Sequence, residues 1–179
     1  ILPYEYNPEK AKQLLAEAGY SNGFKTELVV SQRYIKGLDV CQVIAAQLAE
    51  VGIECVVSEI DHSTRRDKLS AGTIEPLYMA GLGGPYADID MVALLGFNTG
   101  GRYSTYANPE FDTLRQKAAS TIDSNERQKL YSQLQQYTKD EAPAIFLYQQ
   151  HGIYAYNTRV VNWQPRVDEM LVLSGADIK

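Results

Sequence analysis

The residues best suited to bind a small molecule gather in one stretch rich in glycine, tyrosine and aspartate, residues 81–90. Glycines let the backbone approach a ligand closely, while tyrosine and aspartate side chains offer polar contacts. The candidates in this stretch are Gly83, Gly84, Tyr86, Asp88 and Asp90. Four further candidates lie in two other segments, Arg33 and Tyr34 in one and Arg102 and Tyr103 in the other. Together these residue types predict noncovalent binding of a polar solute.

The same residues also fit a purely structural role. Asp88 and Asp90 precede an apolar stretch near Met91, where an aspartate can cap the first turn of a helix. Tyr86 can cover the edge of a core, and Arg102 can pair with one of the two aspartates on the surface. Helix capping and ligand contact therefore both remain open for this segment.

Motifs for catalysis, cofactors and metals are not found in the sequence. There is no Gly-x-Ser-x-Gly turn, and residues 81–86 lack the final glycine of a dinucleotide fingerprint and the Gly-Lys-Ser/Thr of a P-loop. His62 and His151 lie far apart, and no histidine and cysteine cluster has the spacing of metal ligands. We therefore expect no enzyme, no cofactor and no bound metal. The alternatives are a hydrolase of small ester or peptide substrates and a non-transport interaction module.

Alternating helices and strands must position these residues. Caps and apolar periodicity predict helices at residues 8–18, 40–51 and about 61–72, and strands at 24–30, 53–60 and 77–80. This order predicts an α/β fold with a mixed, largely parallel sheet, right-handed crossovers and helices that cover the sheet. Ligands bind beyond the carboxyl ends of such strands, which singles out residues 31–35, 61–65 and 81–90.

The second half of the chain is predicted to be less regular. The elements expected there are a short helix at 91–97, helices opening at Asn108 and Asp123, and strands at 144–148 and 153–156. The last helix must end before Pro143. The two strands form either a turn-linked pair or one long strand, and beyond Asn157 no helical or strand period is clear.

Composition excludes several kinds of partner. The chain has 179 residues, 45% of them hydrophobic, which suits one domain. Its net charge of −5 offers no basic field, so no nucleic acid is expected. No apolar run approaches the roughly 20 residues that span a bilayer.

Cys41 and Cys55 are separated by too much helix and strand for a disulfide, so we expect two buried free thiols.

Several segments match known family motifs in the family's own order. Residues 6–24 are similar to the segment Asp/Asn-Pro-Glu-Lys-Ala-Lys-x-Leu-Leu-x-Glu-Ala-Gly-Tyr. Residues 44–53 and 108–114 are similar to Ile-x-x-x-Leu-x-x-x-Gly-Ile and Asn-Pro-Glu-Phe-Asp-x-Leu. Shorter matches follow at residues 126–127, 141–143 and 145–148. The chain thereby resembles the peptide/nickel class of extracellular solute-binding proteins of ABC transporters.

The resemblance implies a two-lobed protein that closes on a solute, with this chain as most of the second lobe. Residues 1–156 would form the ligand-binding lobe, and residues 157–179 would return to the missing first lobe. The implied ligand is a peptide or a related small polar solute, and the implied partner is a membrane permease. The implied location is periplasmic, or extracellular with a lipid anchor.

The family patterns also bear on the glycine-rich stretch. Many peptide-binding members have Gly-Trp-x-x-Asp there, and the aspartate neutralises the terminal ammonium of the peptide. This chain has Leu82 and Pro85 in place of the tryptophan and the aspartate. Nickel-type members resemble Gly-Ala-Pro-Tyr-Asp-Pro, to which residues 83–88 are closer, with one extra residue before Asp88. The resemblance therefore leaves the solute unnamed.

Overall fold

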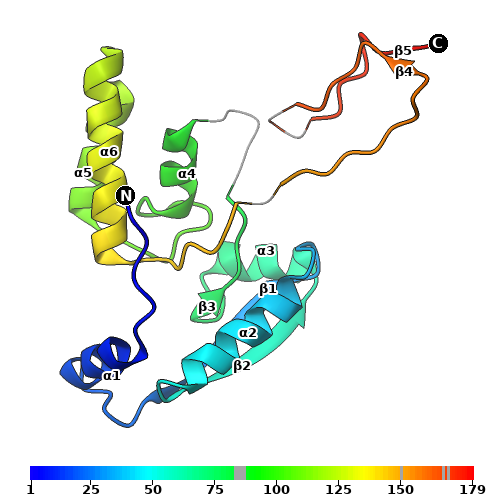
Figure 1. The fold of residues 1–179 in the computed structure, drawn as a ribbon. Helices are drawn as coiled ribbons and strands as arrows, with labels where there is room; N and C mark the ends of the chain where they lie inside the picture. Colours follow the sequence, from blue (N-terminus) through cyan, green and yellow to red (C-terminus); the bar gives the residue numbers. More distant parts are fainter. Residues whose placement is uncertain (83–87, 150, 167, 169) are drawn as a thin grey trace. The chain divides into compact units, whose positions relative to one another are not determined.

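The computed structural model describes residues 1–82, 88–149, 151–166, 168 and 170–179. The chain divides into two compact units, Ile1–Gly81 and Leu82–Lys179, which we call the first and second unit. Each unit has its own cluster of buried hydrophobic side chains. Figure 1 labels the helices and strands in chain order.

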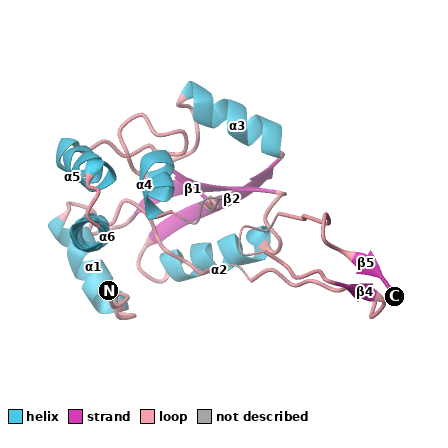
Figure 2. Ribbon diagram, turned by 90° about the horizontal axis from the view of Figure 1, so that it is seen from above, coloured by secondary structure: helices cyan, strands magenta, loops and turns pink. Residues whose placement is uncertain are grey.

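The first unit alternates helices and strands, as the sequence predicts. Its elements are α1 (Pro8–Glu17), β1 (Phe24–Ser31), α2 (Gly37–Ala49), β2 (Ile53–Ile60), α3 (His62–Ala71) and β3 (Leu77–Tyr78). The strands form a parallel sheet in the order β2-β1-β3, which confirms the predicted parallel pairing. From β1 the chain goes to β2 on one side and then to β3 on the other. Right-handed crossovers therefore place α2 and α3 on opposite faces of the sheet, as Figure 2 shows.

Local sequence signals explain where most of these helices begin and end. Asn7 caps α1 by accepting a hydrogen bond from the Lys10 amide at 2.9 Å, and Asp61 caps α3 in the same way. Gly72 ends α3 in the left-handed conformation, with φ at 66°. Helix α2 begins at Gly37 rather than at the predicted residue 40, and no side chain caps it. That start carries no cap signal for sequence reasoning to detect.

The core of the first unit joins the sheet to α2. Its buried side chains are Leu28, Val30, Cys41 and Met79. The Sγ of Cys41 lies 4.0 Å from the Sδ of Met79, and burial raises the pKa of the Cys41 thiol. Cys55 is only half-buried rather than buried as predicted, but both cysteines are free thiols, as predicted.

Two glycines touch where β1 and β2 begin. The strands start in register, with Phe24 opposite Ile53, so the residues that precede them lie side by side. Gly23 has φ at 69°, and a Cβ on it would lie 1.7 Å from the carbonyl oxygen of Gly52. Any residue larger than glycine at position 23 would therefore clash with the turn at Gly52.

The second unit is built mainly from helices. Its elements are α4 (Ile89–Gly96), α5 (Pro109–Ser120), α6 (Ser124–Glu141), β4 (Val160–Val161) and β5 (Asp177–Ile178). The predicted caps are confirmed, since Asn108 accepts from the Phe111 amide and Asp123 from the Glu126 amide. The buried core consists of Ala93, Phe97, Phe111, Ala118, Leu130, Tyr131 and Leu134. Thus α4, α5 and α6 meet through one apolar cluster.

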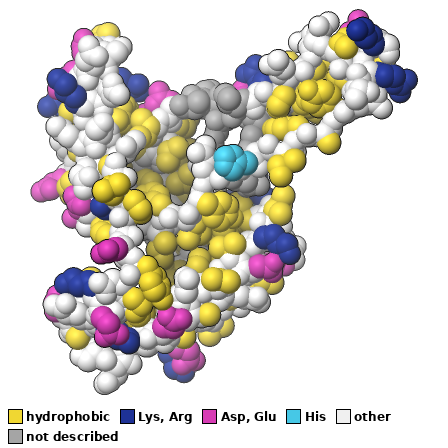
Figure 3. All heavy atoms as spheres, in the orientation of Figure 1, with side chains coloured by type: hydrophobic (Ala, Val, Ile, Leu, Met, Phe, Trp, Pro, Cys, Tyr) yellow, Lys and Arg dark blue, Asp and Glu magenta, His cyan; other side chains and the backbone are white. Residues whose placement is uncertain are grey.

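The strands predicted at 144–148 and 153–156 are wrong. The described residues of both segments form no strand, and their large apolar side chains are exposed. A strand needs a neighbour to hydrogen-bond with, and the sheet found among the described residues of the second unit is the short antiparallel pair of β4 and β5. Figure 3 shows hydrophobic side chains at the surface along the extended segment that Figure 1 draws in orange.

Local contacts organise part of the carboxyl-terminal segment. Trp163 packs edge-on against the rings of Tyr154 and Tyr156, and its Nε1 donates to the carbonyl oxygen of Val172 at 3.1 Å. Among the described residues, no helix is both long enough and apolar enough to cross a bilayer.

Candidate functional site

The loops at the carboxyl end of the parallel sheet meet in the first unit. The Gln32 amide, just after β1, donates to the carbonyl oxygen of Ile60 at the end of β2, at 3.2 Å. The hydroxyl of Tyr34 accepts a hydrogen bond from the Gly81 amide at 2.9 Å. Segments after all three strands thus converge, as expected of the ligand end of such a sheet.

Arg65 lies at the same end of the sheet, at the end of the segment 61–65 that the sequence singled out, but it was not among the candidate ligand contacts. It belongs to the first turns of α3, just after β2, and its side chain is only 2% exposed. Its guanidinium carbon lies 5.7 Å from the ring centroid of Tyr34 and 5.9 Å from that of Tyr78. Arg65 and Arg66 point in different directions on a helix, but this spacing alone does not indicate which side chain faces the sheet.

Of the two candidates after β1, one faces solvent and the other packs inward. Arg33 is exposed, and its amide donates to the Oγ of Ser31 at 3.4 Å. Tyr34 is half-buried and packs so closely on α2 that a Cβ on Gly37 would lie 2.9 Å from the Tyr34 Cβ. The loop after β1 therefore presents an exposed cationic head beside a fixed ring.

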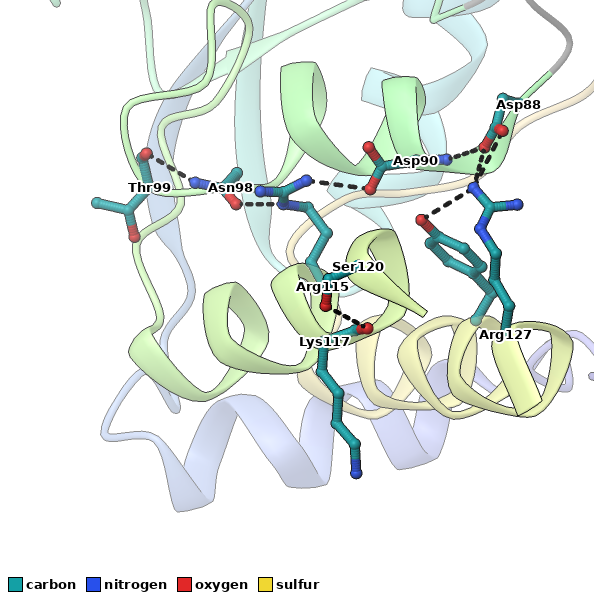
Figure 4. Close-up of polar contacts among 9 residues, drawn as sticks. Asp88, Asp90, Asn98, Thr99, Arg115, Lys117, Ser120 and Arg127 are labelled. Atoms are coloured by element: carbon teal, nitrogen blue, oxygen red, sulfur yellow. Dashed lines mark hydrogen bonds and ion pairs between the residues drawn. The ribbon is translucent and has the colours of Figure 1, made fainter. Parts of the chain in front are cut away.

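Asp88 caps a helix in the second unit. Its Oδ1 accepts a hydrogen bond from the Asp90 amide at 2.8 Å, and α4 begins at the next residue. Arg127 of α6 donates to both carboxylate oxygens of Asp88, at 3.1 and 3.3 Å, as Figure 4 shows. The hydrogen bond from the Asp90 amide lowers the pKa of Asp88, burial opposes it, and Arg127 lowers it further. The capping role left open by the sequence is confirmed for Asp88.

Asp90 is held by a second arginine. Arg115 of α5 donates from Nη1 to Asp90 at 3.0 Å and from Nε to the side-chain oxygen of Asn98 at 2.6 Å (Figure 4). The pKa of the neighbouring Tyr131 is raised to about 12, first by burial and then by Asp90. Two arginines from two helices therefore tie the start of α4 to the rest of the second unit.

The remaining candidates fall into separate places. The guanidinium of Arg102 lies over the ring of Tyr103, 5.6 Å from its centroid, whereas Asp88 pairs with Arg127 and Asp90 with Arg115. Gly83, Gly84 and Tyr86 lie outside the described residues. Among the residues that are described, no three or more His, Cys, Asp or Glu side chains group as metal ligands would.

Two substitutions of Asp88 are expected to distinguish the stability that comes from helix capping from the stability that comes from the carboxylate charge. Asp88→Ala removes both and should lower the free energy of unfolding by about 1 kcal/mol, whereas Asp88→Asn keeps a capping oxygen and should lose less. Because the pKa of Asp88 is lowered in the folded state, its charge stabilises the fold above the ordinary value of 3.8, and this contribution is lost as the pH falls through the folded value. Urea denaturation at neutral and acidic pH measures both effects. A difference between wild type and Asp88→Asn that grows on acidification would contradict the assignment.

Comparison with known proteins identifies the family. Residues 1–104 match the family model described as bacterial extracellular solute-binding proteins, family 5 Middle. Because this match covers more than half of the chain, the chain belongs to that family. The resemblance drawn from the sequence motifs is thereby confirmed, and members of this family are binding proteins rather than enzymes.

Individual relatives agree with this assignment. The glutathione-binding protein GsiB of Pectobacterium atrosepticum is 30% identical over 98% of this chain and 36% of its own length. The periplasmic binding protein DppA from Helicobacter pylori, solved with the peptide STSA, is 32% identical with a TM-score of 0.69, over 80% of this chain and 29% of its own. A periplasmic oligopeptide-binding protein from Borrelia burgdorferi has a TM-score of 0.83 at 24% identity, over 99% of this chain and 38% of its own, and shows the fold alone. The α/β fold class is confirmed, and the chain spans about a third of the length of these proteins.

Proposed function

We propose that this chain is part of the substrate-binding component of an ABC transporter. It captures a peptide or related small polar solute between two lobes and delivers it to a membrane permease. The observation that supports this most directly is the convergence of the three loops at the carboxyl end of the sheet, in a chain that belongs to a solute-binding family. The protein acts outside the cytoplasmic membrane, in the periplasm or held by a lipid anchor, and it catalyses no reaction.

The proposed assignment of residues to the two lobes is the one inferred from the sequence. Residues 1–156 supply most of one lobe, and residues 157–179 return to the other lobe. Closure of two lobes on a ligand couples binding to conformation, since contacts from both sides stabilise only the closed state. Because this chain spans about a third of its relatives, we expect it to bind solute weakly or not at all without the rest of the protein.

The proposed ligand contacts are the residues singled out from the sequence. Arg33 is the strongest of these, because it is exposed beside Tyr34 and can meet a carboxylate with a charge-assisted hydrogen bond. Tyr34, Arg102 and Tyr103 offer further polar or aromatic contacts. Gly83, Gly84 and Tyr86 stay proposed contacts, as do Asp88 and Asp90 in addition to the contacts that hold α4.

Replacement of Arg33 by alanine in the full-length protein is expected to weaken solute binding about 10- to 100-fold, the value of one hydrogen bond to a charged group. Mass spectrometry of small molecules released from the purified protein identifies a bound solute, and calorimetry with glutathione and with a tripeptide mixture measures affinity. Arg66→Ala is the matched control, because Arg66 is also exposed but lies on α3 and pairs with Asp67.

Two outcomes would overturn the proposal. The first is micromolar solute binding by the 179-residue chain alone, since this would mean that no second lobe is needed. The second is turnover of ester or peptide substrates that is lost on mutation of His62 or His151, which would make the chain a hydrolase.

A further inference from the structure

Arg65 is a buried charge whose position needs explanation. Arginine side chains are mostly exposed at protein surfaces, whereas this one is only 2% exposed. It follows Asp61, whose side chain caps α3, so the first turn of the helix directs Arg65 toward the sheet. Its neighbour Arg66 is exposed.

The guanidinium of Arg65 contacts two rings that come from two different strand ends. Tyr34 follows β1, Tyr78 is the last residue of β3, and Arg65 itself follows β2. Both ring centroids lie within 6 Å of the guanidinium carbon, at 5.7 and 5.9 Å. A planar, delocalised and weakly hydrated guanidinium suits such ring contacts better than a lysine ammonium does. One side chain thus links the carboxyl ends of all three strands.

Tyr34 in turn contacts the backbone at Gly81. Its hydroxyl accepts a hydrogen bond from the Gly81 amide at 2.9 Å, and a Cβ on Gly81 would lie 3.1 Å from a carbon of the Tyr34 ring. The Cβ of Tyr34 packs against Gly37 at the start of α2. Tyr34 therefore contacts α2 through its Cβ, and through its ring the residue at which the glycine-rich stretch begins.

We propose that Arg65 is a positioning residue that fixes the ring of Tyr34 and, through it, the backbone at Gly81. Its role is to hold the Gly81 backbone in place at the point where the stretch proposed to bind solute begins, because a contact point fixed in advance costs less to bind. The consequence for solute binding rests on the proposed function, but the positioning itself does not.

Hydrogen exchange at the Gly81 amide tests the proposal in the full-length protein without any ligand. Arg65→Lys keeps the charge and loses the planar group, and we expect it to speed exchange at Gly81 at least tenfold while the amides of Val29 and Val30 in the core of β1 stay protected. Tyr34→Phe should have the same effect because it removes the acceptor. Combined with Arg65→Lys it should add little, since both act on one hydrogen bond. Arg66→Lys is the control and should change nothing.

Two results would overturn the positioning role. One is unchanged exchange at Gly81 in a folded Arg65→Lys variant. The other needs no variant: the side-chain NH proton of Arg65 in the wild type must show the NMR shift that the nearby rings of Tyr34 and Tyr78 impose, and an unshifted proton would mean that the contacts do not exist. Because neither readout uses a solute, a failure of the transport proposal would leave this test intact.

Discussion

Replacing Gly23 with alanine is expected to destabilise the first unit far more than the same replacement at Gly72. Both glycines are in the left-handed region, with φ at 69° and 66°. A Cβ on Gly72 would meet nothing within 4 Å, whereas one on Gly23 would lie 1.7 Å from the carbonyl oxygen of Gly52. Backbone strain alone costs about 1–2 kcal/mol, and overpacking typically adds about 1–3 kcal/mol. We expect a total loss of about 3 kcal/mol or more for Gly23→Ala.

Urea denaturation of the two variants measures this difference. Gly72→Ala is the matched control, because it carries the same backbone strain without the clash. Equal losses of stability in the two variants would mean that the turns before β1 and β2 do not touch. Since Gly23 and Gly52 adjoin the paired residues Phe24 and Ile53, such a result would also question the register of the sheet.

Replacing Phe111 with alanine is expected to destabilise the second unit by about 3–5 kcal/mol, the usual cost of deleting a phenylalanine side chain from a core. Phe111 is only 1% exposed and packs edge-on against the rings of Phe97 and Tyr106. Its removal leaves a cavity that the surrounding helices α4, α5 and α6 can fill only in part.

Phe146→Ala is the matched control for this experiment. It deletes the same side chain from a residue that is 66% exposed and whose ring centroid lies 6.0 Å from that of Phe97. Its expected cost is about 1 kcal/mol or less, the value of one aromatic pair. Denaturation curves of both variants measure the two losses of stability. A loss at Phe146 as large as that at Phe111 would show that residues 144–148 are part of the core.

Local signals allowed much of the fold to be predicted. Asn7, Asn108 and Asp123 cap helices where the sequence places them, because capping depends on residues only two or three positions apart. The helix and strand order of the first half led to the parallel sheet for the same reason, since short crossovers leave few possible topologies. The start of α2 at Gly37 was missed because no capping side chain marks it.

Features that depend on distant partners were predicted poorly. Residues 144–148 have a strand-like composition, but the sequence alone does not say whether a neighbouring strand exists to pair with them. Asp88 was correctly suspected of capping, yet its pairing with Arg127, 39 residues away, left no local trace. Arg65 was not named as a candidate because an arginine on a polar helix is ordinarily solvent-exposed, and its contacts with Tyr34 and Tyr78 are tertiary.

The exposed run from Ile145 to Tyr148 affects the solubility of this chain. It contains β-branched and aromatic side chains, and no charged residue or proline interrupts it. Short segments of this kind can pair with identical segments of other molecules, which makes them starting points for aggregation. Aggregation of the 179-residue chain alone is therefore expected to rise with protein concentration, and a charged substitution within this run is the direct way to reduce it.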